Sequence, residues 1–170
     1  MQTLKKIFLL LLLISSSLQA ECNVLGFMLN YTTMQDITRK HHFIKKSLGD
    51  IIYHVLDPND FGINGLQSID LEFDNYDVLT STTLHFPVND FYYQQIKQIL
   101  DKKYSLNEDI SRETKRGGLF KEKKILGAFR VYETKNCEII LHYDKIISPI
   151  LRVWYRYIHN EISTPIERML

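Results

Sequence analysis

The feature of this sequence that most constrains its fold is an alternation of apolar and polar residues within residues 68–86. Ile69, Leu71 and Phe73 alternate with polar neighbours, which is the period of two expected for a half-buried β-strand. The turn-forming run 74–77 follows, and a second extended stretch completes the segment. The pattern predicts a β-hairpin, so part of the chain should form an antiparallel sheet with one buried face.

Other segments add strands and helices to this hairpin. Further strands are expected at residues 51–56, 125–133 and 137–143, and residues 24–29 are expected to be a first strand or an extended lead-in. Three segments have apolar residues at helical spacing, with capping residues or proline at their ends. The expected helices run from Thr32 or Thr33 to a turn before Gly49, from Asn89 to about Tyr104, and from Ser148 to Pro165.

The order of these elements predicts an α+β fold. We expect a mostly antiparallel sheet of about five strands, with three helices packed mainly on one face. Residues 105–124 are polar and charged, so we interpret them as a loop or a loose hairpin arm.

The first 20 residues have the layout of a secretory signal peptide. Lys5 and Lys6 precede an unbroken apolar run, residues 7–14, and small polar residues lead to Ala20. The apolar run is too short to span a bilayer, which takes about 20 residues. We therefore expect cleavage near Ala20. Residues 21–170 then form a single α+β domain, periplasmic or secreted, with no transmembrane segment.

The charge balance of the expected mature chain excludes a general attraction to nucleic acid. Without Lys5 and Lys6 it has 19 basic and 20 acidic residues, so no global field favours an anionic polymer. The sequence contains neither a glycine-rich phosphate loop nor a G-x-S-x-G nucleophile motif. We expect no cofactor and assign no catalytic residue.

The two cysteines of the chain, Cys22 and Cys137, are predicted to form one disulfide. Disulfides persist in oxidising compartments, which agrees with the expected export. Two free thiols, or a bond to a partner chain, remain open alternatives at this stage.

Two histidines are the candidate ligand-binding residues. His85 and His142 each follow a leucine near the end of an expected strand, and alternation places Glu138 on the same face as His142. If the helices cover the opposite face, these residues share an open face with Asp70, Glu72, Arg130 and Tyr132. His85, His142 and Glu138 are thus candidates for a zinc site or an anion site. A solvated polar face without function is the alternative.

The polar segment 105–124 is the candidate interaction segment, because long loops often carry binding residues. The candidate contact residues within it are Arg112, Lys115, Arg116 and Lys121.

Residues 25–37, from Leu25 through the threonine-capped start at Thr33 to Ile37, resemble the opening of small bacterial envelope proteins of the outer-membrane assembly lipoprotein (SmpA/OmlA) type. The resemblance implies an envelope binding module and assigns no functional residue.

These observations together predict an exported, non-enzymatic binding or accessory protein of the bacterial cell envelope. It is expected to act through contacts with a protein partner. The alternative is a metal-dependent hydrolase or ligand-binding protein that uses the open sheet face around His85 and His142.

Overall fold

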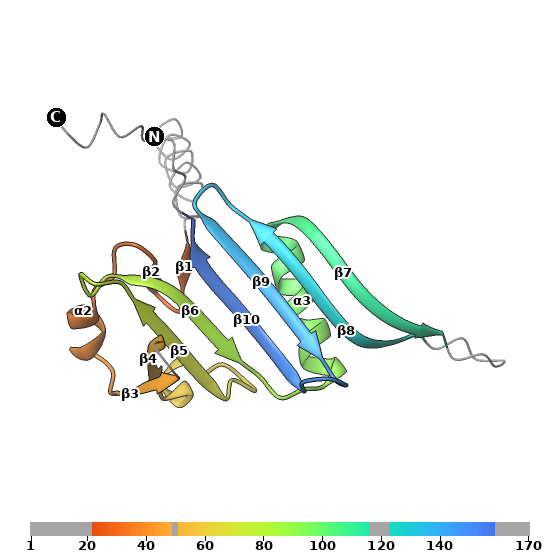
Figure 1. The fold of residues 1–170 in the computed structure, drawn as a ribbon, viewed down its shortest axis with the longest axis horizontal. Helices are drawn as coiled ribbons and strands as arrows, with labels where there is room; N and C mark the ends of the chain where they lie inside the picture. Colours follow the sequence, from red (N-terminus) through yellow and green to blue (C-terminus); the bar gives the residue numbers. More distant parts are fainter. Residues whose placement is uncertain (1–21, 49–50, 116–122, 159–170) are drawn as a thin grey trace, which may run out of the picture.

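An antiparallel sheet of eight strands is the main element of the computed structural model, which describes residues 22–48, 51–115 and 123–158 (Figure 1). The strand order is β3-β4-β5-β6-β10-β9-β8-β7. The strands are β3 (Phe43–Leu48), β4 (Ile51–Leu56), β5 (Ser68–Phe73), β6 (Leu79–His85), β7 (Ser105–Lys115), β8 (Lys123–Glu133), β9 (Cys137–Asp144) and β10 (Ile150–Tyr157).

The remaining described elements are short, apart from one helix. A small two-stranded sheet, β1 (Asn23–Val24) and β2 (Phe27–Met28), opens the described chain, and α2 (Met34–Thr38) follows it. The 3-10 helix η1 (Pro58–Phe61) lies between β4 and β5, and α3 (Asp90–Lys103) connects β6 to β7.

The sheet consists of two four-stranded meanders that meet in its middle. The first meander is β3–β6 and follows α2, and the second is β7–β10 and follows α3. The last strand of each meander lies at the centre, where β6 and β10 pair antiparallel through Arg152 opposite His85 and Arg156 opposite Ser81. The two halves therefore have the same element order and join into one sheet.

The hydrophobic core lies on one face of this sheet, the face that α3 covers. In Figure 1, α3 passes behind β8 and β9. Tyr93 of α3 stacks on Tyr143 of β9 with ring centroids 4.7 Å apart. Ile69 and Leu71 of β5 are fully buried on the core face, so the alternation of residues 68–73 does mark a strand with one buried side.

The predicted α+β class with three helices is wrong. The described chain is mostly β, and α3 is its one long helix. The expected helix after Ser148 is instead the central strand β10, which pairs with both β6 and β9. Leu151 and Val153 are buried with a period of two. A run of β-branched and aromatic residues fits both the helical spacing and the alternation of a strand. The segment forms a strand because it pairs with a neighbouring strand on each side.

Two further segments differ from the prediction. The first helix begins as predicted, with a capping box between Thr33 and Asp36, but it ends at Thr38 and the chain continues as β3. Residues 105–115 form the edge strand β7, which pairs antiparallel with β8, so the alternative of a hairpin arm holds for these residues and the loop does not. An edge strand exposed to water is commonly polar and charged, so its composition resembles that of a loop.

The predicted disulfide between Cys22 and Cys137 is confirmed, with Cα atoms 5.3 Å apart. Both cysteines are buried, and the bond connects the start of the described chain to the first residue of β9. The predicted signal peptide, residues 1–20, lies outside the described residues and stays a prediction. Within the described ranges, no helix is both long and apolar enough to cross a membrane.

Candidate functional site on the open face of the sheet

The face of the sheet opposite α3 carries the candidate site, and we call it the open face. Residues directly opposite each other on paired strands point to the same side, so the register identifies one row of side chains that crosses this face. We call it the central row. Its members are Ser68, His85, Arg152, His142, Phe129 and Ile110, in order from β5 to β7.

His85 is held in place by its neighbour on β5. Its Nε2 lies 2.9 Å from Oδ2 of Asp70. This contact engages Nε2 and fixes the orientation of the ring, so Nδ1 is the ring nitrogen of His85 that remains for another ligand.

Arg152 is the central cation of the row. It is half-buried and lies opposite both His85 and His142. Its guanidinium makes no hydrogen bond or ion pair within the described residues. A guanidinium offers five donors in a planar fork suited to carboxylates, so Arg152 has unused capacity to bind an anion.

His142 is kept neutral by its surroundings. Burial lowers its pKa, the positive charge of Arg152 lowers it further, and Asp144 opposes the shift. Its Nδ1 is buried without a hydrogen-bond partner. A buried N–H without an acceptor costs free energy, so we place the proton of the neutral ring on Nε2, where it is available as a donor.

Trp154 forms a rigid aromatic patch beside the central row. Its Nε1 donates a hydrogen bond to Oγ of Ser81 on β6, and the guanidinium of Arg156 lies 5.2 Å from its ring centroid. Arg156 is fixed in turn by an ion pair to Glu138, with Nε 2.6 Å from Oε1. These contacts hold a large amphipathic side chain in one position, which reduces the entropy lost on binding a partner.

A pocket of about 170 Å³ lies where the central row reaches β8 and β7, and we call it the corner pocket. Gly127, which has no side chain, lines it and lies between Arg112 and Asp144 in the next row. Three apolar residues of the corner pocket are exposed, Phe129 by 36%, Ile110 by 54% and Ile147 by 76%.

The turn between β9 and β10 presents Ile147 to this pocket. Oδ1 of Asp144 accepts hydrogen bonds from the backbone N–H groups of Ile146 and Ile147, at 2.7 and 3.0 Å. These backbone hydrogen bonds lower the pKa of Asp144. The turn is therefore held by its own carboxylate, which leaves two exposed isoleucines at the end of the sheet.

The structure does not bring the three metal candidates together. His85 and His142 are on β6 and β9, with β10 between them, and the cation Arg152 lies between the two histidines in the central row. Glu138 is paired with Arg156 in another row. Among the described residues, no group of three His, Cys, Asp or Glu side chains could hold a metal ion.

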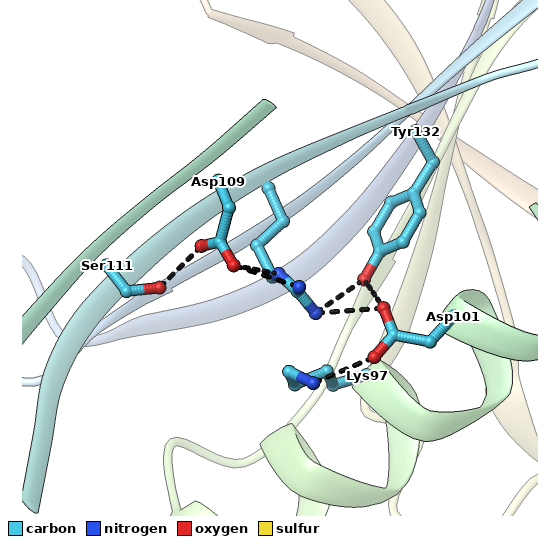
Figure 2. Close-up of polar contacts among 6 residues, drawn as sticks. Lys97, Asp101, Asp109, Ser111 and Tyr132 are labelled. Carbon is cyan, nitrogen blue, oxygen red and sulfur yellow. Dashed lines mark hydrogen bonds and ion pairs between the residues drawn. The ribbon is translucent and has the colours of Figure 1, made fainter. Parts of the chain in front are cut away.

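Arg130 and Tyr132, expected on the open face, lie on the α3 face instead. Arg130 is 5% exposed, and its guanidinium contacts Asp101 of α3 and Asp109 of β7, each at 2.9 Å. Figure 2 shows Tyr132 and Lys97 meeting Asp101 in the same network, with Ser111 bonded to Asp109. Because all these groups satisfy one another, the network fixes α3 to the sheet and offers no open site.

The predicted interaction segment is only partly described. Arg112 is exposed on β7 and lines the corner pocket. Lys115 is the last residue of β7. Arg116 and Lys121 lie outside the described residues.

Sequence reasoning missed the most prominent members of the open face, Arg152 and Trp154, because it assigned them to a helix. A period of two was available as a signal, since Arg152, Trp154 and Arg156 alternate with Leu151, Val153 and Tyr155.

Comparisons with family models, curated proteins and solved structures find no match to this chain. The resemblance of residues 25–37 to the SmpA/OmlA type therefore stays a prediction, and the site has to be interpreted from its own geometry.

Proposed function

We propose that this chain is an exported binding or accessory protein of the bacterial cell envelope, and that it holds a protein partner against the open face of its sheet. The observation that carries the proposal is the composition of that face. Trp154 and Arg152 lie there on β10, and Phe129 lies on β8 beyond the intervening β9, opposite the face that α3 covers.

The composition matches the anchors of known protein interfaces. Tryptophan and arginine dominate the binding energy of such interfaces, and aromatic residues are enriched at their centres. On the open face, Trp154 is fixed by Ser81 and Arg156. A rigid anchor of this kind loses little conformational entropy when a partner covers it.

The disulfide supports the proposed location. A single bond between buried cysteines suits an oxidising compartment such as the periplasm, and Cys22 comes directly after the expected cleavage region. The mature chain would then keep this bond in the envelope.

The test compares changes on the two sides of the molecule in intact cells. Arg152→Glu and Phe129→Ser alter the open face, and Gln98→Glu alters the exposed side of α3. We expect chemical crosslinking to trap a complex with the wild type and with Gln98→Glu. The yield of the same complex should decrease about tenfold with either open-face variant, which is the effect expected from losing one interface anchor. Equal yields from all four proteins would contradict the proposal.

A further inference from the structure

We infer that the open face recognises a carboxylate next to a large apolar side chain on the partner polypeptide. The carboxylate would lie on Arg152 and the apolar group in the corner pocket. This inference rests on the proposed function and names the chemistry of the contact.

The charge pattern of the face selects for an anion at Arg152. The neighbouring acidic groups are already used: Asp70 contacts His85, and Glu138 pairs with Arg156. Arg152, at the centre of the row, has no anion partner among the described residues. A partner carboxylate would complete a charge-assisted hydrogen-bond pair of the strong, bidentate kind.

His142 supplies a second donor beside that cation. It lies directly opposite Arg152 on β9, and side chains in such pairs are about 5 Å apart at Cβ. With Nδ1 buried and unpartnered, the proton placed on Nε2 can be donated to the same carboxylate. The ring also forms an edge contact with Phe129, with centroids 5.9 Å apart.

The corner pocket has the size and lining for one apolar side chain. Its 170 Å³ is close to the roughly 150 Å³ of an apolar cavity that binds benzene. Ile110, Phe129 and Ile147 provide apolar walls. His142 lines the pocket and also borders Arg152, so the two subsites lie within the reach of one residue or of two adjacent residues.

Asp144 sets the orientation of the ligand. It lines the corner pocket, and its negative charge disfavours a carboxylate placed inside. The favoured orientation of the ligand therefore has the carboxylate at Arg152 and the apolar group in the pocket. The reversed orientation is disfavoured because it would place the carboxylate next to Asp144. Arg112 lies across Gly127 from Asp144 in the lining of the pocket, so the two opposite charges there offset each other and the unpaired cation of the central row is Arg152.

The experiment uses small probes and the purified full chain. The probes are N-acetyl-phenylalanine, its neutral amide, and N-acetylglycine, which retains the carboxylate and lacks the side chain. Binding is followed by the fluorescence of Trp154, the single tryptophan, and by NMR shifts, up to about 50 mM because single-residue ligands bind in the millimolar range. We expect the acid to bind about tenfold more tightly than either of the other two probes.

Variants separate the two subsites. Arg152→Gln should reduce the preference for the acid over the amide to less than about twofold, while Arg152→Lys should retain part of it because the charge remains. Ile110→Ser should remove the preference over N-acetylglycine. Arg39→Gln, an equal charge change on an exposed residue after α2, should leave both preferences unchanged.

A further probe distinguishes the source of the carboxylate. N-acetyl-aspartyl-phenylalanine amide has an internal acidic side chain, whereas N-acetyl-phenylalanine imitates a chain terminus. The probe that binds more tightly shows whether the site prefers an internal acidic side chain or the carboxylate of a chain terminus. The inference is overturned if acid and amide bind equally, if Arg152→Gln keeps the preference, or if no probe binds. If a protein partner is trapped on the open face but the small probes show none of these preferences, this inference is overturned and the proposed function stands.

Discussion

Trp154 of β10 donates a hydrogen bond from its indole Nε1 to Oγ of Ser81 on β6, across the junction of the two meanders. The bond therefore connects the two halves of the sheet on the face that α3 leaves open. It also fixes the largest side chain of the candidate binding surface.

Replacing Ser81 tests this connection. Ser81 is 4% exposed, so Ser81→Ala leaves the indole N–H without its acceptor. We expect a loss of about 1 kcal/mol in the free energy of unfolding, the usual effect of one such hydrogen bond. Urea unfolding followed by circular dichroism measures it. Ser68→Ala, at the β5 end of the central row, is the control and should change stability by less than about 0.5 kcal/mol.

The network around Arg130 should stabilise the attachment of α3. Arg130→Met removes a buried cation that contacts Asp101 and Asp109 and leaves two carboxylates close together. We expect a loss of roughly 2–4 kcal/mol, reduced from the value for a fully buried pair because both carboxylates are about one-third exposed.

Lys97→Ala is the matched control for Arg130→Met. It removes only the i,i+4 partner of Asp101 on α3 and should cost less than about 0.5 kcal/mol. Equal losses from the two variants in urea unfolding would show that the network does not hold the helix.

The disulfide should make a large contribution to stability. It closes a loop with a sequence separation of 115 residues, for which the chain-entropy model gives roughly 4–5 kcal/mol. Thermal unfolding of the mature protein should shift to a much lower temperature when reductant is present. The variant Cys22→Ala/Cys137→Ala should unfold at that lower temperature with or without reductant. A wild type that is insensitive to complete reduction would contradict this expectation.

Acid should destabilise the fold through two histidines. Burial is the main cause that lowers the pKa of His54, which packs between Phe43 and Phe73, and the charge of Lys45 adds to it. The pKa of His142 is lowered for a similar reason. The unfolded chain titrates near pH 6.5 and then binds more protons than the folded chain. The free energy of unfolding therefore falls as the pH drops below about 6.5, towards the lowered values.

A pH series of urea unfolding curves measures this effect. The contribution of these two histidines to the free energy of unfolding should be constant above about pH 7 and should decrease towards pH 5. His54→Phe removes one of the two contributions and should flatten the decrease, whereas His42→Gln, at an exposed residue, should leave it as in the wild type. A decrease of the same size in His54→Phe would contradict the role assigned to burial.

Local sequence patterns predicted correctly those elements whose pattern fits only one type of secondary structure. Residues 68–73 alternate strictly and form β5 within those bounds, and Asn89 caps α3 as its position suggests, accepting the N–H of Tyr92. The Cys22–Cys137 bond followed from the number of cysteines and the compartment. For the strand and the helix cap the evidence lies within a few neighbouring residues. For the disulfide, the chain has two cysteines, so only one internal pairing exists.

The segments that were wrong depend on neighbours that the sequence does not identify. Residues 150–157 fit a helical stripe and a strand equally well, and the selection comes from pairing with β6 and β9. This error also concealed the central row, because Arg152 was assigned to a helix surface. His85 and His142 do share the open face, but β10 lies between them, and only the strand order could reveal that separation.

The most direct test of the open face as a partner surface is site-specific photocrosslinking in the envelope of living cells. A benzophenone amino acid is placed at Thr83 or Ile110 on the open face, and at Gln98 on the exposed side of α3. We predict that Thr83 and Ile110 crosslink to the same protein and that Gln98 does not. Crosslinks that form at Gln98 and are absent at both open-face positions would contradict the account and move the partner surface to the helix side.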